Sequence, residues 1–310
     1  MVKNNCFYFI FFCLFGLTTY AQKVSNITYH QEQSNIIVSY DLETKTPCKI
    51  NMFVSTNGGA SWQGPLTKVS GDVGTKIASG SHSITWNVLE EFEELRGDKI
   101  QFQVRAYGEI ETVVIGTQEW TKKNLNVSKY RNGDVIPEVQ DQYEWANLTS
   151  GAWCYYNNEP KNEAIYGKLY NWYAVNDPRG LAPEGYHVPS DPEQKTLTTY
   201  LGGISVAGRK MKSTGTSLWL SPNIGATNSS GFSGLPGGCR FDDGSFKNIV
   251  KTGYWWSSSD TSTRQGYSEE SYSETSTTNA WFLMMLNSLG GAFDVEINKA
   301  SGLSVRCIKD

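Results

Sequence analysis

The sequence predicts two domains of different fold class, an all-β domain over residues 22–108 and an α+β domain with long loops over residues 109–310. Three observations support this prediction. Segments with period-two patterning fill the region from Val24 to about Tyr107, between glycine- and serine-rich breaks. From about Glu109 onward, eight of the ten tryptophans and several paired glycines follow. Both helical patterns that stand out also lie in this second region.

Residues 1–21 have the layout of a secretory signal peptide, with an early lysine, an apolar run and small residues that end at Ala21. A membrane anchor is the rival interpretation, but about 12 apolar residues are too few for a bilayer that needs roughly 20. A lipoprotein signal would need a small residue before Cys13, where Phe12 stands. We therefore expect cleavage after Ala21 and a secreted or cell-surface, extracytoplasmic protein with no transmembrane segment.

The composition narrows the class of partner. The formal net charge is -4, which provides no electrostatic reason for nucleic-acid binding. Charged residues make up 19%, a low share that argues against disorder for most of the chain. Aromatic residues at 13% and 30 glycines indicate a turn-rich protein packed by rings.

The first domain is predicted to be an antiparallel sandwich of immunoglobulin or fibronectin type. Its strands are expected at NIIVSYDL, KINMFVST, HSITWNV and KIQFQVRA. Between them, STNGGASW at residues 55–62 resembles the Asp-box of sialidases, a turn that those enzymes repeat in every propeller blade. Only one copy occurs here, so we favour an ordinary β-turn with Trp62 packed against it.

Two helices and one polar insert are expected in the second domain. YGKLYNWYAVND at residues 166–177 carries apolar residues at three- and four-residue steps. Ser190 and Glu193 form a capping box for a second helix, which Gly202 and Gly203 end. Beyond these glycines we expect mostly strands and loops. Residues 257–279 are rich in serine, threonine and glutamate and predict a mobile surface loop.

The stretch TGYWWSSSD at residues 252–260 enters this insert. If it is extended, Trp255 and Trp256 point to opposite faces and cannot form one aromatic platform. We predict that Trp255 is inside, and that Trp256 lies near the loop surface on the same side as Tyr254.

Seven blocks of sequence together resemble the Fibrobacter succinogenes major paralogous domain. The resemblance runs from about Val113 to Asp310 and implies a secreted or surface protein, because that family is found chiefly there. The blocks are IGTQEWTKKNLNVSKYRNGDVIP, GAWCYYNNEP, YGKLYNWYAVND, GLAPEGYHVPSDPE, AGRKMKSTG, GYWWSSS and GLSVRCIKD.

A fainter similarity links GYHVPSDPEQ and SVRCIKD to the formylglycine-generating, or sulfatase-modifying factor, family. Those proteins have a variant C-type lectin fold, so the resemblance implies a C-type-lectin-like fold for the second domain. Gln194 departs from that pattern, which has tryptophan at this place.

Known catalytic chemistries find little support in the residues. The formylglycine-generating enzymes need a local pair of redox-active cysteines, and Cys239 and Cys307 are separated by 67 residues. His187 is the one histidine of the second domain, too few for a three-histidine metal site, and bracing its turn is the favoured role. There is no G-x-S-x-G motif, and the acidic pairs give no sign of facing each other. We expect a protein that is not an enzyme.

Ligand binding is the remaining chemistry, since exposed rings stack on sugars while amides and carboxylates bind hydroxyls. No metal site is predicted, and calcium is the one cofactor kept as an alternative, because DDGS at residues 242–245 could chelate it. An ordinary turn is the favoured interpretation of DDGS. The candidate ligand-binding residues are Arg240, Asp242, Asp243, Tyr254, Trp256, Asn279 and Trp281.

Four cysteines remain after signal cleavage, and the residues alone leave three pairings open. Cys154 and Cys307 both lie in blocks shared with the major paralogous domain, so the resemblance implies a Cys154–Cys307 disulfide. Cys48 is then expected to stay free.

The favoured function is a secreted or cell-surface binding and adhesion protein that recognises a glycan or a surface protein through loops of the second domain. One alternative is a structural surface module without a small ligand. Another is an enzyme derived from the formylglycine-generating fold.

Overall fold

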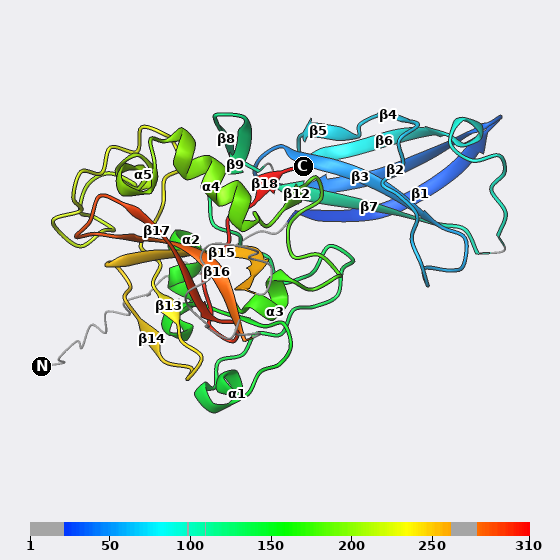
Figure 1. Ribbon diagram of the computed structural model, residues 1–310. Coiled ribbons are helices and arrows are strands. Elements are labelled where there is room, and N and C mark those ends of the chain that lie inside the picture. Colours follow the sequence, from blue (N-terminus) through cyan, green and yellow to red (C-terminus); the bar gives the residue numbers. More distant parts are fainter. Residues whose placement is uncertain (1–21, 98, 109, 262–277) are drawn as a thin grey trace, which may run out of the picture. The chain divides into compact units, whose positions relative to one another are not determined.

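A computed structural model describes residues 22–97, 99–108, 110–261 and 278–310 (Figure 1). The chain divides into two compact units, unit 1 at residues 1–109 and unit 2 at residues 110–310. Strands dominate both, and the helices are few and short. This agrees with the predicted β-rich, α+β class at that coarse level.

Unit 1 consists of two antiparallel sheets around one core. One sheet has the order β1-β2-β6-β4 and the other the order β5-β3-β7. The elements are β1 (Lys23–Glu32), β2 (Asn35–Glu43), β3 (Cys48–Ser55), β4 (Val69–Gly71), β5 (Gly74–Ile77), β6 (Gly80–Asn87), the 3-10 helix η1 (Val88–Glu90) and β7 (Gln101–Gly108).

The core of unit 1 follows from strict alternation along its strands. In β2, residues Val38, Tyr40 and Leu42 are buried while their neighbours in sequence are not. Ile84 of β6 joins the same cluster, as does Val54 of β3 in the facing sheet. Two apolar faces therefore enclose one core, as period-two patterning predicts.

Unit 2 is built from many shorter elements. The sheet with the longest strands has the order β15-β16-β17. A second sheet has the order β12-β18-β9-β8, and two further pairs are β10-β11 and β13-β14. The strands are β8 (Thr112–Ile115), β9 (Gln118–Thr121), β10 (Trp153–Cys154), β11 (Leu169–Tyr170), β12 (Tyr186–His187), β13 (Cys239–Arg240), β14 (Phe246–Lys247), β15 (Thr252–Asp260), β16 (Asn279–Leu286), β17 (Ala292–Asn298) and β18 (Ile308–Lys309). The helices are α1 (Gln142–Ala146), η2 (Tyr156–Asn158), η3 (Pro160–Asn162), α2 (Glu163–Tyr166), α3 (Trp172–Val175), α4 (Asp191–Tyr200) and α5 (Ile204–Met211).

Three expectations about local structure need correction. The single helix over residues 166–177 is replaced by the one-turn helices α2 and α3 with strand β11 between them, because Gly167 has a φ of 72° that ends α2. Helix α5 was not expected after Gly203. The predicted insert begins later than expected, because β15 continues through Asp260, and residues 262–277 lie outside the described part. The capping box of α4 is confirmed.

Strand β15 is buried on both faces from Thr252 to Ser257. Tyr254 and Trp256 pack into one core cluster, whereas Trp255 packs into another with Leu283 and Met285 of β16. The two tryptophans do point to opposite faces. Trp256 is nevertheless 0% exposed, so its predicted position near the surface is wrong. Each face is covered by segments distant in sequence, which strand patterning does not reveal.

Three buried cations, Arg240, Arg306 and Lys212, connect the loops of unit 2, and each is at most 1% exposed. Their partners are mainly backbone carbonyl oxygens, and each also lies over an aromatic ring. Arg306 donates to the carbonyls of Thr121, Phe232 and Ser233 and to Oδ1 of Asn124, and Lys212 Nζ donates to the carbonyls of Ile224, Leu286 and Leu289. Burial lowers the pKa of Arg306 to about 9 and that of Lys212 to about 8.

Candidate functional site

Three of the seven predicted ligand-binding residues are buried in unit 2. Arg240, Tyr254 and Trp256 are 1%, 6% and 0% exposed. Trp256 Nε1 donates to the Tyr170 carbonyl at 2.7 Å, and the Tyr254 hydroxyl accepts from Asn248 at 2.8 Å. Burial raises the pKa of Tyr254 to about 12. These three side chains belong to the core and cannot contact a ligand at the surface.

Arg240 has a positioning role instead. Its Nη1 donates to the Val139 carbonyl at 2.7 Å, and its Nε donates to the Gly244 carbonyl at 3.0 Å. Its Nη2 donates to the carbonyls of Gln140 and Asp141 at 2.9 and 3.0 Å. The guanidinium therefore ties the β13–β14 turn to the segment that leads into α1.

Asp242 and Asp243 lie exposed on that turn, next to α1. Asp243 Oδ1 accepts from the Ser245 amide at 2.8 Å, and its carbonyl accepts from Gln142 Nε2 at 3.0 Å. A side chain at Gly244 would lie 2.5 Å from the Gln142 carbonyl, so the turn and the helix are in direct contact. DDGS thus forms a turn that is hydrogen-bonded within itself and to α1.

Tyr143 of α1 is a residue that the sequence analysis missed. Its side chain is 79% exposed, while Trp145 on the other side of the same helix is fully buried. Asp141 caps α1 by accepting from the Glu144 amide at 2.8 Å. The capping aspartate is the sequence signal that could have identified this residue, because it indicates a helix start with Tyr143 in its first turn. We call Gln142, Tyr143, Asp242 and Asp243 the α1 rim.

Asn279 and Trp281 lie elsewhere, two residues apart on β16, and both are partly buried. They stand opposite Asn298 and Glu296 of β17 in the antiparallel register. The predicted site is therefore divided between the β13–β14 turn and the β16–β17 ladder.

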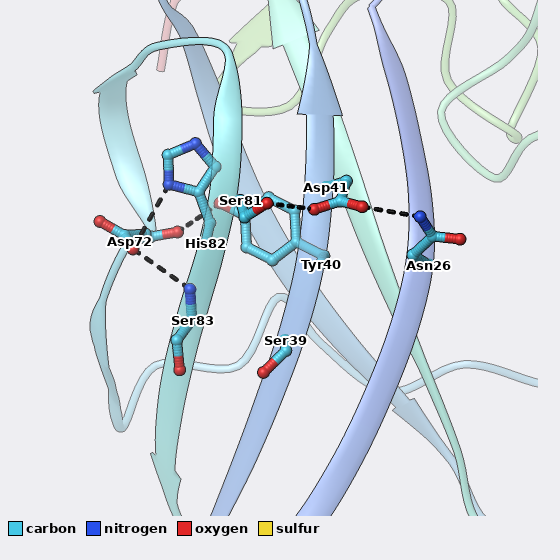
Figure 2. A pocket seen from close by; sticks show the side chains of 8 residues that line it. All are labelled: Asn26, Ser39, Tyr40, Asp41, Asp72, Ser81, His82 and Ser83. Carbon is cyan, nitrogen blue, oxygen red and sulfur yellow. Dashed lines mark hydrogen bonds and ion pairs between the residues drawn. The ribbon is translucent and has the colours of Figure 1, made fainter.

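Unit 1 has a shallow polar depression of about 340 Å³ on its β1-β2-β6-β4 sheet (Figure 2). A bulge in β1 places Asn26 at a φ of 54°, and its amide donates to Asp41 Oδ2 at 2.7 Å. Ser81 donates to the other oxygen of Asp41 at 2.6 Å. Both carboxylate oxygens thus already have partners within the depression.

His82 in the same depression does not form a catalytic pair. Its Nδ1 lies 3.3 Å from Asp72 Oδ2, and its Nε2 lies 2.8 Å from the Ala78 carbonyl. With both ring nitrogens engaged, the imidazole has no nitrogen left to accept a proton from Ser81 or Ser83. The arrangement lacks the geometry of a serine nucleophile with its base (Figure 2).

His187 is likewise held on both sides. Its Nδ1 lies 2.7 Å from Asp310 Oδ1, and its Nε2 lies 2.9 Å from Glu193 Oε1. Burial alone would lower the pKa of His187, but hydrogen bonds to these two carboxylates raise it above its ordinary value. Glu193 also caps α4, so the histidine braces the turn before that helix.

The four described cysteines are buried free thiols, so the expected Cys154–Cys307 disulfide is absent from the structure. Cys154 packs with Trp145 and Leu169, whereas Cys307 packs in the separate core that contains Tyr254 and Trp256. Two different cores therefore enclose the two sulfur atoms. Burial raises the pKa of both thiols to about 12, which leaves them protonated and unreactive near neutral pH.

The described residues include neither a metal-binding cluster nor a membrane-spanning helix. No group of three or more histidine, cysteine, aspartate or glutamate side chains there is arranged to hold a metal ion. Across the same residues, no helix combines the length and the apolar character needed to cross a bilayer.

Comparison with known proteins identifies unit 2. The family model of the Fibrobacter succinogenes major domain matches residues 113–309, which confirms the resemblance drawn from the seven sequence blocks. No curated protein and no solved structure matches the chain.

Proposed function

The chain belongs to the Fibrobacter succinogenes major domain family, and from this premise we propose that it is a secreted or cell-surface, non-catalytic protein that binds glycans through the α1 rim. The apolar N-terminal segment supports export, although residues 1–21 lie outside the described part. Mass spectrometry of the extracellular fraction tests this location, and it should find the mature chain with Gln22 at its N-terminus.

The observation that supports binding is the exposed side chain of Tyr143 on a helix that contacts the turn bearing two exposed carboxylates. A tyrosine face stacks on the apolar face of a sugar, while carboxylate oxygens accept hydrogen bonds from its hydroxyls. The buried Arg240 bonds to both segments that carry these groups, so their arrangement exists before any ligand arrives. Preorganisation of this kind lowers the entropic cost of binding.

A glycan array followed by titration calorimetry tests the proposal. Tyr143→Ala should weaken binding of any glycan that the wild type retains by about tenfold or more, because a stacked ring is lost. Tyr200→Ala is the matched control, since Tyr200 is also a largely exposed helical tyrosine, at 66%. Equal binding by the wild type and Tyr143→Ala would contradict a role for the α1 rim.

The same titrations address the cofactor and the alternative functions. We propose that no cofactor is required, so the isotherm should be the same with calcium and with a chelator. A structural surface module would bind no glycan on the array. If the ligand is a protein, the wild-type chain should capture a member of a surface-protein library, and Tyr143→Ala should abolish that capture.

The finer fold assignments are also proposals. Two antiparallel sheets around one alternating core support an immunoglobulin or fibronectin type for unit 1. Long loops, a capped helix α4 and a short antiparallel sheet support a C-type-lectin-like type for unit 2. An experimental structure of the mature chain checks both.

A further inference from the structure

Three side chains of unit 2, remote in sequence from the α1 rim, form a closed triangle of hydrogen bonds. Lys168 Nζ donates to Asn126 Oδ1 at 2.7 Å and to Glu163 Oε1 at 3.1 Å. Asn126 Nδ2 donates to the same Glu163 oxygen at 3.0 Å. One carboxylate oxygen therefore contacts both the amine of the lysine and the amide nitrogen of the asparagine.

The backbone holds these groups next to each other. Leu125 accepts from the Lys168 amide at 3.3 Å, and Asn124 donates to the Tyr166 carbonyl at 2.9 Å. A Cβ at Gly167 would lie 2.8 Å from the Leu125 carbonyl, so the two segments touch. The asparagine and the lysine are thus held on adjacent, packed segments, although 42 positions separate them in sequence.

The lysine amine is largely shielded from water. The Lys168 side chain is 5% exposed, and Nζ lies 4.5 Å from the centre of the Trp153 ring and 5.3 Å from that of Tyr155. A base must therefore be in direct contact for Nζ to lose a proton, and Glu163 is in such contact.

From this geometry we propose that Lys168 and Asn126 form an intramolecular amide cross-link, with Glu163 as the proton-transfer group. A carbonyl carbon lies about 1.2 Å from its oxygen, so Nζ is within about 4 Å of the Asn126 Cγ that it would attack. A desolvated lysine amine beside a base is an activated nucleophile.

The step balances without any further reactant. Glu163 accepts a proton from Nζ, and the neutral amine attacks Cγ of Asn126. The bond between Nζ and Cγ forms, the bond between Cγ and Nδ2 breaks, and nothing is oxidised or reduced. Nζ loses two protons in all, and the departing nitrogen gains two and leaves as ammonium. Because Glu163 Oε1 already contacts Nδ2, the same oxygen can deliver the proton to the leaving group.

Glu163 is ionised before the reaction. Burial alone would raise its pKa, but hydrogen bonds from Lys168 and Asn126 outweigh burial, and the pKa lies below its ordinary value. The residue is therefore a carboxylate at neutral pH, and it holds the transferred proton only transiently, between Nζ and the leaving nitrogen.

The test is tryptic peptide mapping of the purified, secreted full-length chain by tandem mass spectrometry. We expect a branched peptide that joins the segment containing Asn126 to the segment containing Lys168, short of their summed mass by one ammonia. Trypsin should also fail to cleave after Lys168. Intact mass is insufficient by itself, because an N-terminal Gln22 also loses ammonia when it cyclises.

Variants assign the roles. Glu163→Gln and Asn126→Ala should abolish the branched peptide and restore cleavage after Lys168. Glu159→Gln is the matched control, since Glu159 pairs with Lys161 at 2.8 Å in an exposed ion pair nearby, and it should keep the cross-link. Near-ultraviolet circular dichroism identifies any variant that fails to fold.

Three outcomes would overturn the proposal. Complete cleavage after Lys168 in the wild type shows that the amine is free. Conversion of Asn126 to aspartate shows that water, rather than Nζ, attacks the amide. A branched peptide that persists in a folded Glu163→Gln variant removes the carboxylate from the reaction.

Discussion

Unit 1 and unit 2 satisfy the hydrogen bonds of their buried backbone groups in different ways. In unit 1, strands of up to ten residues pair along their length, and an alternating aliphatic face covers the core. In unit 2, many elements have only two to five residues, and buried cations bond to the carbonyl oxygens that no ladder satisfies. Regular pairing and cation–carbonyl bonding both satisfy buried polar groups, but the second makes stability depend on a few side chains.

The largest effect on stability is expected when one buried cation is removed. Arg306→Met should destabilise unit 2 by about 3 to 5 kcal/mol, because several buried oxygen atoms lose their donor at once. Urea unfolding followed by tryptophan fluorescence measures the change. A loss below about 1 kcal/mol would show that the cation does not organise these loops.

Unit 1 should respond instead to loss of apolar volume. Ile84 is fully buried in the core between the two sheets, and Ile84→Ala should cost about 2 to 4 kcal/mol. Differential scanning calorimetry should show the transition of unit 1 shifting down while that of unit 2 stays in place. Parallel shifts of both transitions would indicate that the two units do not unfold independently.

A smaller effect is expected at the Asp-box-like turn of unit 1. The buried Ser55 hydroxyl donates to Asn57 Oδ1 and accepts from the Gly59 amide, both at 2.8 Å. Ser55→Ala should therefore cost about 1 kcal/mol in the free energy of unfolding. Ser83→Ala, an exposed change in the same unit, serves as the control and should be neutral.

The smallest effect is a pH dependence in unit 2. Because the folded pKa of His187 is raised, its contacts stabilise the fold fully below the unfolded pKa near 6.5, and this stabilisation is lost as the pH rises through the folded value. The difference in the free energy of unfolding between wild type and His187→Gln should be about 0.5 to 1 kcal/mol at acidic pH and should fall toward zero as the pH rises. It is small because the histidine and its carboxylate partners are partly exposed. A difference that grows with pH would reverse this sign. Urea unfolding across a pH series measures it.

Two local patterns predicted the local structure correctly. Alternation in NIIVSYDL predicts the buried face of β2, and Ser190 with Glu193 predicts the start of α4. Both depend on contacts within a few residues. The positioning role of Arg240 could not be predicted from the sequence. Three of the carbonyl oxygens that it contacts lie about 100 positions earlier, where no local pattern reveals them.

The sequence by itself determined the family, the strand patterning of unit 1, the capped helix and the opposite orientation of Trp255 and Trp256. Only the tertiary structure decided that both rings are buried, that Cys154 and Cys307 occupy separate cores, and that the helix carrying the exposed Tyr143 contacts the turn at Asp243. The reason is physical. Side-chain periodicity follows from backbone geometry, but burial depends on which distant segments cover each face.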